Sequence, residues 1–206
     1  MRLLLASVPG GGKSTVLQLV KKRKPNVTIK NFGDFMFDLA KEKYNIQDRD
    51  DMRKLLSIDE RRKLQYEAAE KLAKFEHVII DSHVAVKTSK GFYPGFPEDV
   101  LQKLHFDIIV LMEFRPEDVM YRRNLDVDIK APRKTAAGTV AQPRGKRDVE
   151  TLEEIEFHQQ INRMFGASAA QQSKCNLKVI NLRFAESKSF EHAKVAAKEI
   201  IKLLEP

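Results

Sequence analysis

Cysteine is almost absent from this chain of 206 residues, in which Cys175 stands alone, and tryptophan is missing altogether. A single cysteine excludes an internal disulfide framework and a zinc site built from several cysteines, and it fits a reducing compartment. Apolar runs are also short, since none approaches the roughly 20 residues that a membrane-spanning helix needs. The apolar stretch at residues 3–6 is too short for a signal peptide. We therefore expect a cytoplasmic protein without zinc and without a membrane partner.

Positive charge is what the chain has in excess. Its 37 Lys and Arg residues exceed its 29 Asp and Glu residues, which gives a formal net charge of +8. This excess predicts a polyanionic partner, such as nucleic acid, phospholipid head groups or phosphorylated small molecules. A hydrophobic content of 42% excludes a wholly disordered chain, and the length suits one generous domain over residues 1–206.

Short apolar runs alternate with longer helical patterns along the chain. The expected strands are 2–6, 27–31, 77–81, 106–113 and 177–182, and the expected helices are 13–24, 34–44, 57–75, 116–125, 151–173 and 190–204. Two of these helices begin with capping boxes, Ser57 to Glu60 and Thr151 to Glu154. Because the strands do not alternate and helices separate them, they predict an α/β fold with about five parallel strands covered by helices on both faces.

Two segments are expected to lack regular structure. Residues 127–146 contain two prolines, two glycines and many small residues without periodicity, which predicts a mobile loop or flap inserted into the α/β core. Residues 88–95 are rich in turn formers and are also expected to form a loop.

The most informative stretch is a glycine-rich loop between the first strand and the first helix. Its residues are Ser7, Val8, Pro9, Gly10, Gly11, Gly12, Lys13, Ser14 and Thr15. Backbone N–H groups of such a turn cradle phosphate oxygens, and the helix that follows presents its positive end to the same anion. Lys13 would reach the β- and γ-phosphates, and the Ser14 hydroxyl would bind Mg²⁺. Ser7 occupies the position where the usual G-x-x-x-x-G-K-[ST] pattern has its first glycine.

A second signal of this class is an apolar strand that ends in an acidic residue near the magnesium ion. Asp81 and Glu113 both end such strands. Asp81 is the better candidate because the polar residues Ser82 and His83 follow it, whereas Phe114 follows Glu113. We expect Asp81 to act on the metal through water, although a strand-end aspartate can also simply be solvated.

Five motifs in chain order resemble archaeal-type adenylate kinases, in the P-loop nucleoside monophosphate kinase superfamily. They are SVPGGGKST at 7–15, NFGDFMFDLAKE at 31–42, DRDDMRK at 48–54, VIIDSHVAVKTSKGFYPGFP at 78–97 and EFHQQINR at 156–163. The resemblance implies the P-loop three-layer fold, the reaction ATP + AMP ⇌ 2 ADP with Mg²⁺, and a homotrimer. It also implies an AMP-binding helical region at 31–75 and a lid at 124–148.

The resemblance assigns residues to the AMP side of the site. Arg53 would hold the AMP phosphate, and Ser82, His83 and Lys87 would lie near the AMP. Arginine suits such a role because its planar fork binds phosphate bidentately and stays charged.

Arginines on both sides of the flap are assigned to the ATP side and to catalysis. Arg122 and Arg123 end the helix that leads to the flap, and which of them meets substrate stays open. Arg144 and Arg147 lie on its return side, where the resemblance places Arg144 on the ATP phosphates and Arg147 among the catalytic residues. Polar residues of the late helix, Gln159 and Asn162, would bind substrate or, as is usual for helices, face solvent.

The flap departs from the family pattern. It is about 16 residues longer than expected, which leaves the register of the lid arginines open. Five of the eight net positive charges fall within residues 127–147, which favours the phosphates of bound nucleotides over a general nucleic-acid surface. Two alternatives remain: a kinase for another nucleoside monophosphate, and an RNA- or ribosome-associated P-loop ATPase with an adenylate-kinase-like fold.

Overall fold

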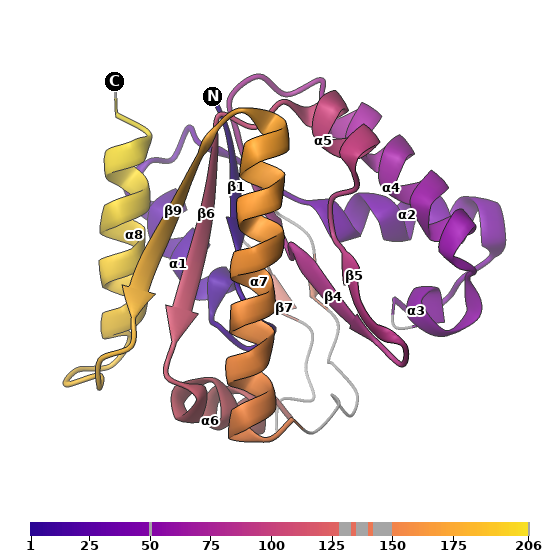
Figure 1. The fold of residues 1–206 in the computed structure, drawn as a ribbon. Helices are drawn as coiled ribbons and strands as arrows, with labels where there is room; N and C mark the ends of the chain where they lie inside the picture. Colours follow the sequence, from indigo (N-terminus) through magenta and orange to yellow (C-terminus); the bar gives the residue numbers. More distant parts are fainter. Residues whose placement is uncertain (50, 128–132, 135–139, 142–149, 206) are drawn as a thin grey trace.

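A parallel sheet forms the centre of the protein, whose computed structural model describes residues 1–49, 51–127, 133–134, 140–141 and 150–205 (Figure 1). Its strands run in the order β2 (Thr28–Asn31), β3 (Val78–Ser82), β1 (Arg2–Ala6), β6 (Ile108–Phe114) and β9 (Asn176–Leu182). All four pairings are parallel, and the burial of β1 and β6 on both faces explains their unbroken apolar sequences. The predicted α/β fold is therefore confirmed.

Helices cover both faces of this sheet, which gives three layers. One face packs against α1 (Lys13–Arg23) and α8 (Glu191–Leu203). The other packs against α2 (Phe32–Tyr44), α4 (Ile58–Leu72), α5 (Glu98–Leu104) and α7 (Leu152–Ser173). Two further helices, α3 (Asp51–Leu55) and α6 (Pro116–Val127), lie toward the end of the sheet where β1, β3 and β6 finish (Figure 1).

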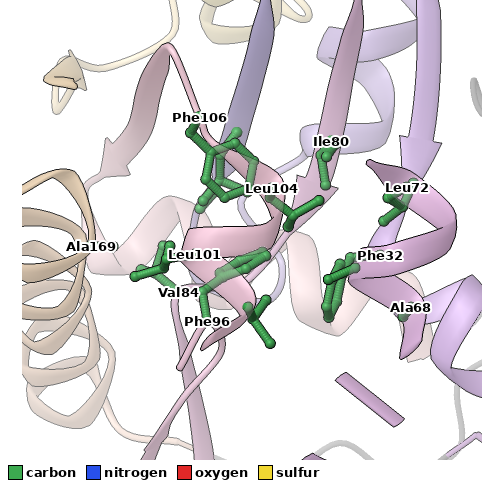
Figure 2. Packing of buried hydrophobic residues seen from close by; sticks show 14 of the residues in the cluster. Phe32, Ala68, Leu72, Ile80, Val84, Phe96, Leu101, Leu104, Phe106 and Ala169 are labelled. Carbon is green, nitrogen blue, oxygen red and sulfur yellow. The ribbon is translucent and has the colours of Figure 1, made fainter. Parts of the chain in front are cut away.

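The core on the α2–α7 face is built around aromatic side chains (Figure 2). Phe96 contacts Phe32 at a centroid distance of 4.9 Å and Phe106 at 5.4 Å in an edge-on arrangement. Full burial of each such ring contributes about 2–3 kcal/mol. These contacts hold the start of α2 and the segment before α5 against the sheet.

The structure differs from the sequence-based expectations in three places. Residues 88–95 were expected to form a loop, but they take part in a hairpin of β4 (Ala85–Thr88) and β5 (Gly91–Pro94), whose turn is closed by a hydrogen bond from Thr88 Oγ1 to the Gly91 carbonyl at 2.8 Å. The short helices α3 and α5 were not predicted. Within the expected flap, β7 (Arg133–Lys134) pairs with β8 (Val140–Ala141). The other flap residues from 128 onward lie outside the described part of the chain.

Within the described ranges, no helix combines the length and the apolar character that crossing a membrane requires.

Candidate active site

The predicted site residues gather where three neighbouring parallel strands end. The register pairs Ala6, the last residue of β1, with Ser82 of β3 and with Leu111 of β6. The loop after β1, the segment after β3 and the end of β6 therefore share one edge of the sheet. In open α/β sheets this carboxyl edge is where ligands bind.

The glycine-rich loop adopts a backbone that requires glycine at two positions. Gly10 has φ +89° and Gly12 has φ +78°, while the Gly11 N–H donates to the Val8 carbonyl at 3.1 Å. Gly12 is also the N-cap of α1, which has no side-chain cap and no acidic residue in its first turn. A helix start without a capping side chain or an acidic residue suits the binding of an external anion.

Ser7, the departure from the usual motif, is accommodated by the absence of a side chain at Gly11. A Cβ atom at Gly11 would lie 2.6 Å from Ser7 Oγ and 2.9 Å from Phe114 Cε2. The buried Ser7 hydroxyl donates to the Val8 carbonyl at 3.0 Å, so its hydrogen-bond donor has a partner within the loop. Serine can therefore stand at this position without disturbing the turn.

Lys13, at the start of α1, points toward the end of β3. Its Nζ donates to the Ser82 carbonyl at 2.8 Å and lies 3.4 Å from Asp81 Oδ1. His83 donates from Nδ1 to the Ser7 carbonyl at 2.9 Å, because a carbonyl oxygen can only accept. The structure thus brings Lys13, Asp81, Ser82 and His83 into one cluster beside the glycine-rich loop.

The oxygen donors of this cluster fit a magnesium ion. Asp81 Oδ2 accepts from Asn31 Nδ2 at 2.9 Å, whereas buried Asp81 Oδ1 forms the ion pair with Lys13 at 3.4 Å but no hydrogen bond in the described part of the chain. Ser14 is exposed in the first turn of α1. Mg²⁺ takes oxygen ligands and keeps several waters, so one hydroxyl and one carboxylate acting through water suit it.

Arg123 of α6 is the arginine that the structure places at the glycine-rich loop. Its Nε donates to the Pro9 carbonyl at 2.8 Å, and its Nη1 donates to a carboxylate oxygen of Glu150. The side chain packs so closely on the loop that a Cβ atom at Gly10 would lie 2.6 Å from Arg123 Cγ. Its buried Nη2 finds no hydrogen-bond partner in the described part of the chain, which leaves this NH₂ group with its two N–H donors for an anion.

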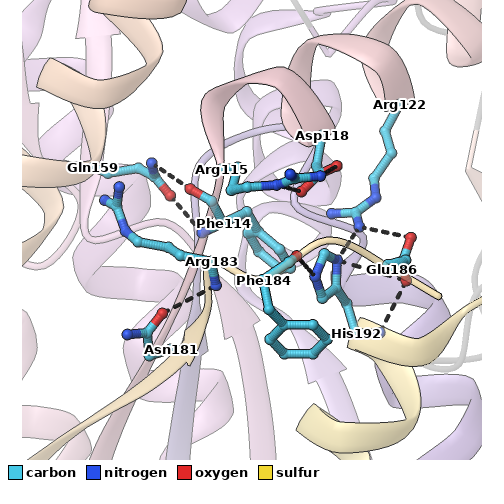
Figure 3. Close-up of polar contacts among 10 residues, drawn as sticks. All are labelled: Phe114, Arg115, Asp118, Arg122, Gln159, Asn181, Arg183, Phe184, Glu186 and His192. Carbon is cyan, nitrogen blue, oxygen red and sulfur yellow. Dashed lines mark hydrogen bonds and ion pairs between the residues drawn. The ribbon is translucent and has the colours of Figure 1, made fainter.

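Arg122, the other candidate, points toward Glu186 and His192 (Figure 3). Its guanidinium lies over the Phe114 ring at 4.9 Å, and its Nη2 is 3.3 Å from Glu186 Oε2 and 2.6 Å from His192 Nδ1. The two neighbouring arginines therefore have different surroundings, and of the two it is Arg123 that has a hydrogen bond to the glycine-rich loop in the described part of the chain.

Lys87, predicted near the AMP, lies on β4 and meets Glu150, which the sequence reasoning missed. Its Nζ donates to Glu150 Oε1 at 3.0 Å and to Glu154 Oε1 at 3.2 Å. Burial by itself raises the pKa of Glu150, but interactions with His158, Arg123 and Lys87 outweigh it and lower that pKa to about 2. Glu150 is thus an ionised, buried carboxylate between two of the predicted site cations. The sequence contained one indication of this role, because Glu150 follows the predicted catalytic residue Arg147 by three positions.

The remaining predicted residues are placed only in part. Arg53 belongs to α3, but its side chain is outside the described part of the chain, as are Arg144 and Arg147. Nearby, Arg49 donates to Asp34 Oδ1 at 2.6 Å and to Asn31 Oδ1 at 2.9 Å. Asn31 was also missed, although it ends a strand beside Asp81.

Comparison with solved structures defines the class of protein to which this fold and site belong. The chain matches a shikimate kinase from Bacteroides thetaiotaomicron with a TM-score of 0.60 at 16% identity, covering 100% of this chain and 99% of that one. It also matches the YorR protein of Bacillus subtilis with a TM-score of 0.57 at 18% identity, covering 99% and 95% of the two chains. These likenesses show a P-loop kinase fold.

The sequence relatives give the family. A family model described as an AAA domain matches residues 6–138. An adenylate kinase of Pyrobaculum aerophilum is 41% identical, covering 99% of this chain and 96% of the relative. An adenylate kinase of Thermoplasma acidophilum is 37% identical, covering 87% and 88%. The chain belongs to the adenylate kinase family, and it is a nucleotide-binding P-loop kinase.

Proposed function

We propose that this adenylate kinase catalyses reversible, Mg²⁺-dependent transfer of a phosphoryl group from ATP to AMP, which gives two ADP. The observation that carries the proposal is the convergence of Lys13, the Nη2 of Arg123 and the uncapped start of α1 on one glycine-rich loop. Phosphoryl transfer needs positioned cations more than covalent chemistry, and this arrangement supplies them.

On the ATP side, the backbone of Ser7 to Thr15 would cradle the phosphates. Lys13 would exchange its contact with the Ser82 carbonyl for a phosphate oxygen, and Arg123 would add the donors of its Nη2 group. Arg144 is proposed for the ATP phosphates, and Arg122 and Arg147 keep their proposed catalytic roles. Ser14 directly, and Asp81 through water, would hold Mg²⁺, which when bound neutralises charge on the β- and γ-phosphates.

On the AMP side, Arg53 of α3 would bind the AMP phosphate. Ser82 at the end of β3, His83 just after it and Lys87 of β4 would lie near the AMP. We propose residues 31–75 as the AMP-binding helical region of a single 1–206 domain. Residues 124–148 would form the lid, whose closure excludes water so that ATP is not hydrolysed.

Further proposals follow from the resemblance and from composition. A homotrimer is proposed from the family likeness, and a cytoplasmic location from the scarcity of cysteine. The expected small-molecule partners are ATP, AMP and ADP. The assay below also tests whether RNA stimulates the protein.

The test is a coupled assay with Mg-ATP and one of AMP, CMP, UMP or GMP. Diphosphate formation with AMP alone supports the proposal, and a preference for another monophosphate identifies the alternative kinase. Phosphate release that RNA stimulates, without ADP from AMP, would refute the proposal in favour of the ATPase alternative.

Lys13→Ala should lower kcat about 100-fold to 1000-fold, because a cation on the transferring group is lost. Lys22→Ala, at an exposed position of the same helix, is the matched control and should leave kcat unchanged. A Lys13→Ala variant with near-normal turnover would show that the loop has a different role.

A further inference from the structure

A single buried carboxylate joins two cations that come from different parts of the fold. Glu150 is 7% exposed and lies just before α7. One of its oxygens accepts from Arg123 of α6, and the other accepts from Lys87 of β4 at 3.0 Å. His158 of α7 lies 3.6 Å from the same carboxylate. Glu150 therefore links the wall of the glycine-rich loop to the hairpin on the acceptor side.

The contacts of Arg123 show what Glu150 determines. A guanidinium is planar, so anchoring two of its nitrogens fixes the direction of the third. Nε is anchored by the Pro9 carbonyl and Nη1 by Glu150, while Nη2 has no partner among the residues described. Without Glu150, one anchor would remain and the plane could rotate about it. The carboxylate thus sets where the Nη2 group of Arg123 points.

Lys87 is held in a similar way but less exclusively. Its Nζ also contacts Glu154, whose side chain is 48% exposed and therefore screened by water. Glu150 is the buried partner of the two, with a side chain that is 5% exposed. A buried ion pair is stronger than an exposed one, so Glu150 contributes more than Glu154 to the position of Lys87.

We propose that Glu150 is a positioning residue for phosphoryl transfer, which orients Arg123 toward the donor phosphates and Lys87 toward the acceptor in one rigid unit. This inference rests on the proposed adenylate kinase reaction and deepens it. Glu150 contacts no phosphate itself, because its negative charge would repel one. Its effect reaches the reaction only through the two cations.

The proposal makes a specific kinetic prediction. Removing the charge of Glu150 leaves both cations near the site, so nucleotides should bind as well as before or more tightly. The cations would no longer be oriented, and misplacement by about 1 Å can cost about 100-fold in rate. Glu150→Gln should therefore lower kcat about 10-fold to 100-fold, with KM for ATP and for AMP unchanged or lowered.

The experiment measures kcat, both KM values and thermal stability for the full-length wild type, Glu150→Gln and Glu150→Asp. The aspartate keeps the charge but withdraws the oxygens by about 1.5 Å, so its kcat should lie between the other two. Glu199→Gln is the matched control, because the two carboxylate oxygens of Glu199 in α8 also accept from two cations, Lys178 at 2.9 Å and Lys202 at 2.7 Å. Its kcat should stay within twofold of the wild type.

The outcomes separate this inference from the proposed function. If the wild type forms no ADP from AMP, the proposed function fails whatever the variants do. If the wild type is active and folded Glu150→Gln keeps its kcat within twofold, the positioning role is overturned. It is equally overturned if both KM values rise in step with a loss of kcat, as a general structural collapse would produce. Should Glu150→Gln not fold, Glu150→Asp decides, since an unaltered kcat in that variant contradicts the proposal.

Discussion

Gly10 and Gly12 offer a matched pair of substitutions within one loop. Both have positive φ, at +89° and +78°, so alanine at either position adopts an unfavourable backbone conformation. Their surroundings differ, because a Cβ atom at Gly10 would lie 2.6 Å from Arg123 Cγ, whereas one at Gly12 meets no described atom within 4 Å. Comparing the two variants therefore separates the backbone cost from the cost of displacing Arg123.

The expected magnitudes follow from these two contributions. A non-glycine residue at positive φ costs about 1–2 kcal/mol, and Gly12→Ala should lose about that much free energy of unfolding. Gly10→Ala should lose a further 1–3 kcal/mol or so, because the added methyl group overpacks the Arg123 stem. In a chain of this size each kcal/mol lowers Tm by about 2–4 °C.

The assay is urea denaturation followed by far-UV circular dichroism, with Tm from thermal scans as a second measure. The double variant Gly10→Ala with Arg123→Ala tests the cause directly, because the smaller side chain removes the overlap. In that background Gly10→Ala should cost no more than Gly12→Ala does alone. If Gly10→Ala and Gly12→Ala destabilise the wild type equally, the proposed seating of Arg123 on the loop is wrong.

Two further predictions concern acid stability and the start of α2. Because the pKa of Glu150 is lowered to about 2 from an ordinary 4.5, its ionisation stabilises the fold by about 3 kcal/mol above pH 4.5, and this is lost as pH falls toward 2. The stability difference between wild type and Glu150→Gln, measured by denaturation across that window, should shrink with falling pH, and a constant difference would contradict this. Asn31→Ala should cost about 1 kcal/mol or more, because Asn31 Oδ1 caps α2 by accepting from the Asp34 N–H at 3.1 Å. Asn31→Ser keeps a capping oxygen and should cost less in the same denaturation assay, whereas equal losses would show that the cap is unimportant.

Local chemistry explains which features could be predicted from the sequence. The apolar runs of β1 and β6 are buried on both faces, so their composition alone identified them as buried strands. Both predicted capping boxes are present, at Ser57 with Glu60 and at Thr151 with Glu154. Capping depends on residues three positions apart, and such short-range pairing is visible in a sequence without knowledge of the fold.

Long-range packing explains what could not be predicted. Gln159 and Asn162 were expected to face solvent or substrate, but both are buried. Gln159 donates to the Phe114 carbonyl at 3.0 Å and accepts from the Phe114 N–H at 2.8 Å, which joins α7 to the end of β6 (Figure 3). These residues are 45 positions apart. No periodicity within α7 distinguishes a polar side chain that serves a distant backbone from one that meets water.

The two arginines of α6 show where the limit lies for the site itself. Consecutive helical residues point about 100° apart, so the sequence predicts different surroundings for Arg122 and Arg123. The sequence does not show which of the two arginines contacts the glycine-rich loop, because this depends on which side chain can pack against the loop in the folded protein. That packing is made possible by Gly10, whose missing Cβ lets Arg123 Cγ approach. Gly10 therefore allows the turn and also leaves space for the Arg123 side chain. The first role could be predicted from the sequence, whereas the second could be recognised only from the fold.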